Sequence, residues 1–211
     1  MKELWVEKYR PKKLDGYVFR DEHQKEQVQR WVKEGTIPHL LFSGNAGIGK
    51  TTLAKILTKN IPCDVMYVNA SDNTGVDFVR DKIKPFASSM GFHDIKVVIL
   101  DEADYLNPNS TQPALRGFIE EFSRNCRFIF TCNFKNRIID PLHSRCSVVD
   151  FTLRNEEKVQ MAGLFFKRIH GILNQENVEF DTKVVAEVIK KHFPDFRRTI
   201  NELQRYAKFG K

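Results

Sequence analysis

The chain has 211 residues, of which 41% are hydrophobic and 29% are charged. This balance is typical of a folded protein with a substantial core and excludes a disordered tail, while the net charge of +7 favours a polyanionic partner. The N-terminus mixes both charges without the apolar run of a signal peptide, and no later run is long enough to span a bilayer. We therefore expect a soluble intracellular protein without a membrane partner. The four cysteines and six histidines lack metal-ligand spacing, which favours buried thiols over a metal site or disulfides.

The first segment, residues 5–18, has neither a helical nor an alternating period, and Pro11 restricts the residue before it to an extended conformation. We expect an irregular leader laid over another part of the fold. Two interpretations are open: its aromatic and aliphatic side chains pack on the face of a base, or the segment covers an edge of the sheet. After the leader, Asp21 is the predicted N-cap of a helix over Glu22–Glu34 that ends at Gly35.

The most informative stretch is residues 40–52, which read LLFSGNAGIGKTT. A short apolar run suited to a buried strand leads into the motif G-x-x-x-x-G-K-T, and a helical period follows. In such a strand, loop and helix, the loop amides and the positive end of the helix face an anion. Lys50 then reaches the β and γ phosphates of a nucleotide and the Thr51 hydroxyl binds Mg²⁺, while Gly47 and Gly49 let the backbone approach phosphate. The alternative, a glycine-rich turn before an ordinary helix, is disfavoured by the full eight-residue match.

A second strand is predicted over residues 64–71, followed by an amphipathic helix over residues 76–90 that packs on the sheet. Pro85 falls inside this helix, so we expect a kink or an early end there. Arg80 and Lys84 lie one turn apart on a neighbouring face.

The third strand, in residues 96–100, runs directly into Asp101 and Glu102. Ligands of open α/β sheets sit at the carboxyl ends of the strands, where both carboxylates are therefore expected. Asp101 is a candidate for the Mg²⁺ shell. Glu102 is a candidate for orienting and polarising a water that attacks the γ-phosphate. An acidic pair after a strand is by itself an ordinary turn, so this assignment depends on the phosphate loop upstream.

A helix over residues 110–123 and a fourth strand over residues 127–133 follow, and the strand ends at Asn133. Its amide is a candidate for a hydrogen bond to the γ-phosphate or the attacking water, with capping of the next turn as the alternative. A fifth strand over residues 147–151 completes the alternation. The sequence therefore predicts an α/β fold with an open, five-stranded parallel sheet and helices on both faces.

From residue 155 onward the strand pattern stops and three amphipathic helices predict a small helical domain. The first of them carries an apolar stripe of Val159, Ala162, Phe166, Ile169 and Leu173. We expect an α/β domain at residues 1–153 and a helical domain at residues 154–211.

Taken together and in this order, the landmarks resemble the AAA+ ATPases of sliding-clamp loaders, meaning the small subunits of replication factor C and the ATPase subunit of T-even-type phage clamp loaders. The most specific matches are VEKYRP at residues 6–11, NASD at 69–72, DEAD at 101–104 and SRC at 144–146, and FPDFRRTI at 193–200 is closer to the phage branch. The resemblance covers essentially the whole chain. Such subunits normally carry a collar domain beyond a helical lid, so we expect this chain to be the AAA+ module alone, without the collar.

The resemblance implies an ATPase that uses ATP and Mg²⁺ and is activated by assembly with clamp and DNA. The residues it places around the nucleotide are Val6, Glu7, Lys8, Tyr9, Arg10, Pro11 and Val18 at the adenine, Gly47, Ile48, Gly49, Lys50, Thr51 and Thr52 at the phosphates, and Arg197, in preference to Arg198, on the closing lid. Thr51 and Asp101 would hold the metal. The catalytic set would be Lys50, the Walker B pair Asp101 and Glu102, Asn133 as sensor of the γ-phosphate, and Arg145 as a finger into the neighbouring subunit's site. Arg80 and Lys84 would track the phosphates of DNA, an assignment that Pro85 weakens.

The function implied is that of a clamp-loader subunit which, in an oligomeric spiral, opens a sliding clamp and places it on primer-template DNA, with hydrolysis triggering release. Its partners would be the clamp, the DNA and other loader subunits, in the host cytoplasm for a phage-encoded protein. The alternatives are another oligomeric AAA+ DNA remodeller of the branch-migration type, a P-loop small-molecule kinase, and a DNA-binding module with a structural ATP. A kinase has no use for Ser-Arg-Cys before the fifth strand, and Glu102 argues against a structural ATP.

Overall fold

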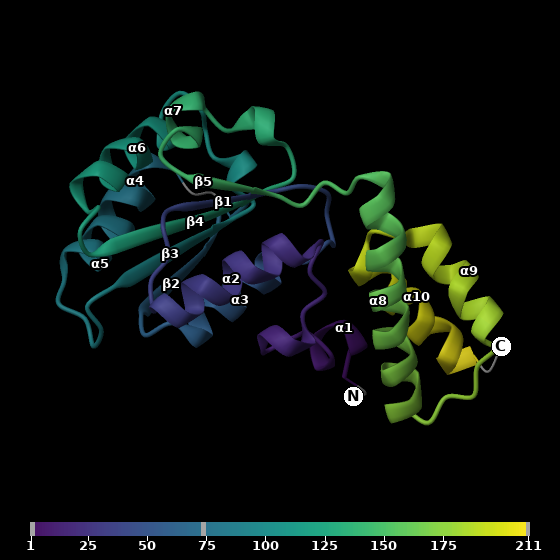
Figure 1. The fold of residues 1–211 in the computed structure, drawn as a ribbon. Coiled ribbons are helices and arrows are strands. Elements are labelled where there is room, and N and C mark those ends of the chain that lie inside the picture. The colour runs from purple at the N-terminus through teal and green to yellow at the C-terminus, as the bar shows by residue number, and fades with distance from the viewer. Residues whose placement is uncertain (1–2, 73–74, 210–211) are drawn as a thin grey trace.

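A single five-stranded sheet forms the centre of the larger part of the molecule in the computed structural model, which describes residues 3–72 and 75–209 (Figure 1). Its strands are β1 Leu40–Ser43, β2 Asp64–Asn69, β3 Lys96–Asp101, β4 Cys126–Cys132 and β5 Ser147–Asp150. They lie in the order β2-β3-β4-β1-β5, and every pair is parallel. The predicted fold class is therefore confirmed. Because all strands run the same way, their carboxyl ends meet at one edge, where the residues after β1, β3 and β4 come together.

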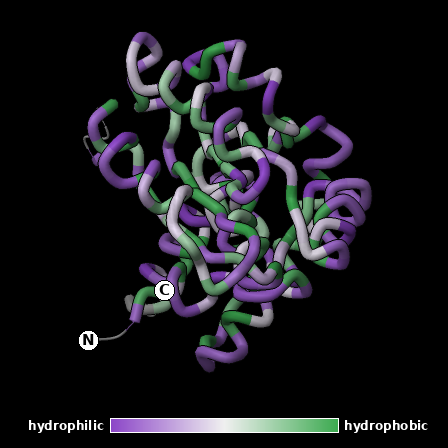
Figure 2. Tube along the Cα trace, turned by 90° about the vertical axis from the view of Figure 1, so that its left-hand side faces the viewer, coloured by the Kyte–Doolittle hydropathy of each residue, from purple (hydrophilic) through white to green (hydrophobic). Residues whose placement is uncertain are grey.

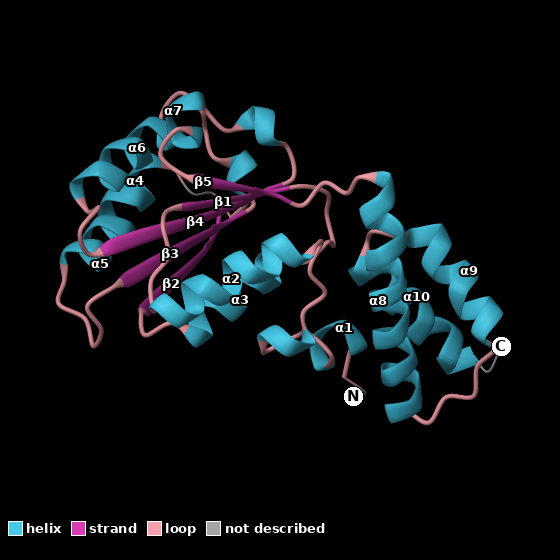
Figure 3. Ribbon diagram, in the orientation of Figure 1, coloured by secondary structure: helices cyan, strands magenta, loops and turns pink. Residues whose placement is uncertain are grey.

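Helices cover both faces of the sheet (Figures 1 and 3). On one face lie α2 Glu22–Glu34 and α3 Lys50–Asn60, and on the other lie α4 Val76–Phe78, the π-helical η2 Val79–Ile83, α5 Lys84–Ser88, α6 Thr111–Glu121 and α7 Asp140–His143. Two short 3-10 turns, η3 Ala103–Tyr105 and η4 Lys135–Arg137, follow β3 and β4. Each face has its own apolar core, and hydrophobic stretches concentrate inside the molecule (Figure 2). The three inner strands, β1, β3 and β4, are buried almost throughout, which explains their continuous apolar sequence, whereas the edge strands β2 and β5 keep exposed positions.

The second part of the molecule is a three-helix lid, formed by α8 Asn155–Gln175, α9 Thr182–His192 and α10 Phe196–Phe209. As predicted, helices joined by short loops make up its described part, residues 155–209, without any strand. The predicted apolar stripe of α8 is partly wrong, because Val159 is 78% exposed while Met161, Phe165 and Ile172 are buried. Helix α8 packs against α9, α10 and the leader together, so its buried side is wider than one stripe and turned toward these partners.

The leader is more ordered than predicted, with one helical turn, α1 Trp5–Lys8, and a 3-10 turn, η1 Leu14–Gly16. Trp5 is buried in the apolar core of the lid, and its backbone N–H donates to Gln204 Oε1 of α10 at 3.1 Å. This turn is held by tertiary contacts and not by a local apolar period, which is why sequence periodicity did not indicate it.

Two local predictions have different outcomes. Helix α2 begins and ends as predicted, with the Asp21 carboxylate accepting from Gln24 N at 2.7 Å and Gly35 in the left-handed conformation at φ 67°. The early end at Pro85 is wrong: the helical path continues to Ser88. The π-helical stretch just before Pro85 accommodates the missing N–H of the proline.

All four cysteines are free thiols. Cys126 and Cys132 are buried, and Cys63 and Cys146 are half-buried. Burial raises the pKa of each of these thiols, so they are poor nucleophiles at neutral pH. Within residues 3–72 and 75–209, no helix is both long and apolar enough to cross a membrane.

Candidate nucleotide site

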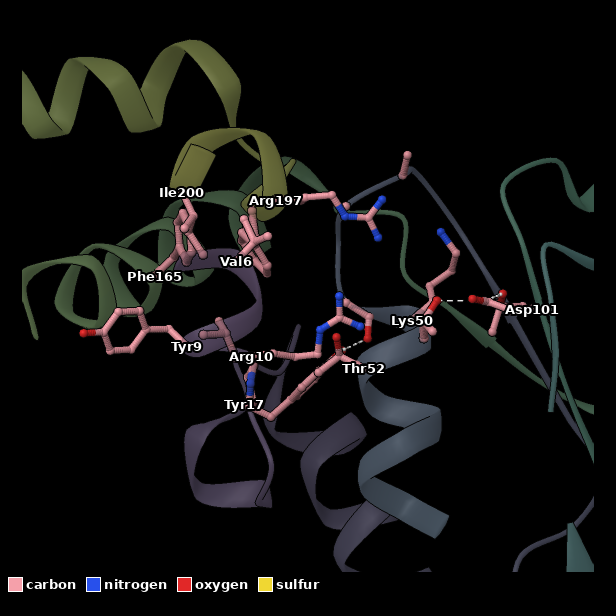
Figure 4. Close-up of a pocket in the computed structure, with 18 of the residues that line it drawn as sticks. Val6, Tyr9, Arg10, Tyr17, Lys50, Thr52, Asp101, Phe165, Arg197 and Ile200 are labelled. Carbon is pink, nitrogen blue, oxygen red and sulfur yellow. Dashed lines mark hydrogen bonds between the residues drawn. The ribbon is translucent and has the colours of Figure 1, made fainter. Parts of the chain in front are cut away.

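A pocket opens at the carboxyl edge of the sheet, where the leader, the phosphate loop and the lid meet (Figure 4). The predicted residues that line it are Val6, Tyr9, Arg10, Pro11, Val18, Gly47, Gly49, Lys50, Thr51, Thr52, Asp101, Glu102, Asn133 and Arg197. Residues far apart in the sequence thus converge on one cavity. Apolar side chains occupy one end of it, and the charged groups of the loop and of β3 occupy the other (Figure 4).

Three residues predicted for this site are not in the lining. Glu7 and Lys8 are exposed: Glu7 accepts from Arg10 Nη2 at 2.5 Å, and Lys8 Nζ donates to Glu176 at 2.6 Å. Ile48 is 1% exposed and belongs to the core beside α3, so its side chain anchors the loop. Of these three, only the backbone of Ile48 remains a candidate for phosphate contact.

The phosphate loop between β1 and α3 depends on glycines. Gly47 and Gly49 have φ of 75° and 105°, a left-handed region that side chains rarely adopt. Space is restricted as well, since a Cβ on Gly49 would lie 2.9 Å from the Tyr17 hydroxyl oxygen. The loop therefore takes a shape in which backbone amides, and no side chains, approach an anion at the start of α3.

Lys50, the first residue of α3, is a buried cation without an ion-pair partner among the described residues. Its Nζ donates to the carbonyls of Gly44 and Asn45, both at 2.7 Å, and to Asn133 Oδ1 at 2.9 Å. Burial lowers the pKa of Lys50 to about 8. A buried ammonium surrounded by neutral acceptors is costly, and a phosphate oxygen beside it removes that cost.

The Asp101 carboxylate, at the end of β3, receives three hydroxyl donors. Thr51 Oγ1 and Thr131 Oγ1 donate to Oδ1 at 2.7 and 2.5 Å, and Tyr67 Oη donates to Oδ2 at 2.5 Å. The Thr51 hydroxyl and Asp101 are hard oxygen ligands of the kind Mg²⁺ prefers. No cluster of three or more acidic, histidine or cysteine ligands occurs among residues 3–72 and 75–209. That donor set suits a metal that takes its other ligands from phosphate and water.

Glu102 follows directly and adopts a left-handed conformation, with φ 56° and ψ 42°. Its N–H donates to Thr131 Oγ1 at 3.1 Å, which holds this unusual backbone in place. In η3, just after β3, Asp104 Oδ2 accepts from the N–H groups of Asn133 and Phe134, which follow the neighbouring strand β4, both at 3.2 Å. These bonds fix the positions of Glu102 and Asn133 at the rim of the pocket.

The lid reaches the phosphate loop through the first residues of α10. Phe196 N donates to the Gly47 carbonyl at 3.2 Å, and Asp195 Oδ1 accepts from Arg198 N at 2.9 Å. Arg197 extends from α10 toward the loop (Figure 4) and lines the pocket, whereas Arg198 does not. The geometry thus favours Arg197, as the sequence did.

The other predicted residues lie outside the pocket. Arg145 is not in the lining of its own chain's site; it is bonded to Glu120 through Nε at 2.8 Å and through Nη2. Arg80 is exposed on η2. Lys84 Nζ lies 3.3 Å from the Glu121 carboxylate and over the Phe118 ring.

Several lining residues had not been predicted: Tyr17, Ala46, Thr131, Phe165, Arg168, Phe196 and Ile200. The sequence did contain a signal for Thr131. It is a polar residue in an apolar strand, two positions before Asn133, and residues two positions apart on a strand lie on the same face of the sheet. Phe165, Arg168 and Ile200 look like ordinary positions of amphipathic helices. Only the packing of the lid on the leader brings them to the pocket.

Comparison with known proteins agrees with this geometry. Residues 40–153 match the family model of the ATPase family associated with various cellular activities (AAA). Residues 157–211 match the model of the AAA+ ATPase lid domain of the sliding-clamp-loader large subunit. The chain belongs to the AAA family of ATPases.

Among its relatives is the sliding-clamp-loader large subunit of Escherichia phage RB69, 42% identical over 97% of this chain and 64% of the relative. Another is the replication factor C small subunit of Natronomonas pharaonis, 40% identical over 99% of this chain and 64% of the relative. The chain therefore spans about two thirds of the length of these curated relatives. The Thermotoga maritima RuvB Holliday junction branch migration motor superposes with a TM-score of 0.73 over 95% of this chain and 65% of that one. At 20% identity this likeness shows the fold alone.

Proposed function

We infer that this chain is the ATP-hydrolysing module of a sliding-clamp loader, with an α/β nucleotide domain at residues 1–153 and a lid at residues 154–211. The observation that carries the inference is the convergence of Lys50, Thr51, Asp101 and Glu102 at one pocket roofed by the lid. The names of the relatives support the loader assignment over a branch-migration motor, whose solved structures share only the fold.

In this proposal each residue has one task. The apolar end of the pocket, with Val6 and Val18, receives the adenine, and the loop amides and Lys50 bind the phosphates. Mg²⁺, held by Thr51 and Asp101 together with phosphate oxygens, neutralises charge at the reacting phosphate. Glu102 orients a water and accepts its proton.

Lys50, Asn133 and Arg197 act on the γ-phosphate in this scheme. Lys50 and Asn133 approach it from the sheet, where the two side chains already share a hydrogen bond, and Arg197 approaches it from the lid. Because Arg197 and the loop belong to different parts of the molecule, phosphate binding joins the lid to the sheet.

The remaining assignments concern partners. Arg145 is turned away from its own pocket, so we assign it to the site of a neighbouring subunit. Arg80 is exposed on η2 and is assigned to a DNA phosphate, with Lys84 as a weaker second candidate because it is paired with Glu121. A sliding clamp and primer-template DNA are the partners proposed for the assembled complex.

The test is ATP-dependent association. The chain is mixed with the sliding clamp encoded by the same genome and with primed DNA, and the mixture is resolved by size-exclusion chromatography in ATP or in ADP. We expect co-elution in ATP and separation in ADP, with Glu102→Gln strengthening the ATP complex because its turnover stalls. Equal elution in both nucleotides, or a preference for a four-way junction over primed DNA without any clamp binding, contradicts the loader assignment.

A further inference from the structure

Tyr67 reaches the proposed metal site from β2, outside the motif residues of the phosphate loop and β3. It lies on β2, one of the two edge strands of the sheet, and pairs in register with Ile99 of β3. Although its side chain is 44% exposed, its hydroxyl donates to Asp101 Oδ2 at 2.5 Å. The ring therefore leans along the strand toward the carboxyl edge, past its own register partner.

The two oxygens of Asp101 are held in different ways. Oδ1 accepts from both Thr51 and Thr131, at 2.7 and 2.5 Å. Oδ2 has one donor among the described residues, the Tyr67 hydroxyl. Two threonine hydroxyls thus hold Oδ1 in place, whereas Oδ2 is held by Tyr67 alone. Both sets of bonds limit rotation of the carboxylate about the Cβ–Cγ bond.

The ring of Tyr67 is itself supported. Lys55 Nζ lies 4.4 Å from the ring centroid, an attractive arrangement between a cation and an aromatic face. Lys55 is one helical turn beyond Thr51 on α3, so the helix that carries the metal-binding hydroxyl also holds the ring. A tyrosine that only covered the sheet edge would not require its hydroxyl to reach Asp101.

We propose that Tyr67 is a positioning residue for Mg²⁺: it fixes the Asp101 carboxylate so that Oδ1 faces the Thr51 hydroxyl and the metal. Hydrogen bonds to ligating carboxylates orient them, and their loss typically lowers metal affinity about 10- to 100-fold. This inference rests on the proposed function, since it concerns the metal that accompanies ATP at the same pocket.

Tyr67→Phe is the decisive variant, because it removes one oxygen and keeps the ring and its contact with Lys55. Binding of a fluorescent ATP analogue is measured while Mg²⁺ is titrated, and again in EDTA. We expect the Mg²⁺ concentration for half-maximal enhancement of binding to rise about 10-fold. Binding in EDTA and the thermal unfolding midpoint should stay unchanged.

Tyr105→Phe is the matched control, since Tyr105 is 60% exposed and its hydroxyl has no hydrogen-bond partner within the part of the chain that the structure describes. It should leave the Mg²⁺ requirement unchanged. An unaltered Mg²⁺ requirement in Tyr67→Phe overturns the inference, and so does an equal loss of binding with and without Mg²⁺, which indicates a general structural role. Absence of nucleotide binding by the unaltered chain under every condition would instead overturn the proposed function.

Discussion

Glu102 combines an unusual backbone with a proposed chemical task. The left-handed conformation of a non-glycine residue costs about 1–3 kcal/mol and persists only where neighbouring contacts impose it. Here the contact is the bond from Glu102 N to Thr131 Oγ1, and the same hydroxyl donates to Asp101. Thr131 therefore couples the orientation of the proposed base to that of the proposed metal ligand.

Glu102→Gln should retain ATP binding within a few-fold and lower turnover by about 10² to 10⁴, because the amide keeps the shape but cannot accept a proton. Lys50→Ala should instead weaken ATP binding, since it removes the buried cation of the phosphate loop. Equilibrium binding and single-turnover hydrolysis separate the two effects. Parallel losses of binding and turnover in Glu102→Gln would contradict its assignment as the base.

His39 offers a test of the core independent of nucleotide. Its Nδ1 accepts from Phe128 N at 3.2 Å, and burial together with nearby Arg127 lowers its pKa to about 4. Because the folded pKa lies below the unfolded value near 6.5, the unfolded chain binds more protons between pH 6.5 and 4. This contribution to stability is complete above pH 6.5 and is lost as the pH falls toward 4.

The expected loss between pH 7 and pH 4.5 is about 2 kcal/mol, because one pKa unit corresponds to about 1.4 kcal/mol and pH 4.5 still lies above the folded pKa. Urea unfolding at pH 7 and pH 4.5 measures it. His39→Asn should flatten the pH dependence, because its side-chain oxygen still accepts from Phe128 N and does not titrate in this range. The same pH slope in both proteins would show that the acid sensitivity has another origin.

At the residue scale, the sequence indicated those groups whose chemistry requires a fixed spacing. Lys50 and Thr51 belong to a contiguous motif. Asp101 and Glu102 directly follow an apolar, β-branched run that is typical of a buried strand. Tyr67 carries no such signal, because its bond to Asp101 arises only when β2 pairs beside β3. Side chains that meet through strand pairing cannot be found from local pattern alone.

Among the elements, the helical path from α4 to α5 departs most from expectation. Pro85 lacks an N–H and would break a regular α-helix. Here the helix does not end before Pro85; five π-helical residues, Val79–Ile83, precede it and the helical path continues. The change in pitch alters the relative directions of residues before and after it. Sequence periodicity assumes a constant 3.6 residues per turn, so it could not anticipate where Arg80 and Lys84 point.

Arg80→Ala should lower affinity for unrelated primed DNA sequences alike and reduce the log-log salt slope by about one, as expected for the loss of one phosphate contact. Lys84→Ala should change the slope less, since Lys84 is already paired with Glu121. Lys82→Ala, two residues from each, is the matched control on the same exposed segment. Binding of the assembled complex at several salt concentrations measures the slopes, and an unchanged slope in Arg80→Ala means that Arg80 is only a solvated surface charge.

For the whole molecule, the order of strands and helices predicted the sheet and the separate helical region. The composition of the pocket was less predictable, because its lid residues, Phe165, Arg168 and Ile200, reach it through packing between distant segments. Arg168 Nη2 donates to the Tyr9 carbonyl at 2.6 Å and Nη1 donates to that of Gly16. Contacts of this kind depend on the tertiary arrangement and leave no periodic trace.

Arg145 defines a prediction for the assembled state. Since it is bonded to Glu120 outside its own pocket, Arg145→Ala should hardly change hydrolysis by the dilute chain. It should strongly reduce turnover once subunits, clamp and DNA assemble, because an arginine supplied in trans contributes about 10³ to 10⁵ in rate. Steady-state hydrolysis as a function of protein concentration measures both effects.

A mixing experiment tests the direction of action. Arg145→Ala and Glu102→Gln subunits, each impaired alone, should recover some activity together, since some interfaces then pair an intact Glu102 with an intact Arg145. Brisk hydrolysis by the dilute chain that Arg145→Ala abolishes would show that the arginine acts within its own subunit.

The bonds between leader and lid have a consequence for timing. Trp5 packs in the core of the lid, and Arg168 of the lid donates to carbonyls of the leader. The leader and the lid are thus held together as one part, while the phosphate loop belongs to the sheet domain. In the proposed function, ADP would lie between these two parts and leave when they separate. On that proposal, the hydrogen bond from Phe196 N to the Gly47 carbonyl must break before ADP leaves, so the strength of this contact at the start of α10 would set the rate of product release.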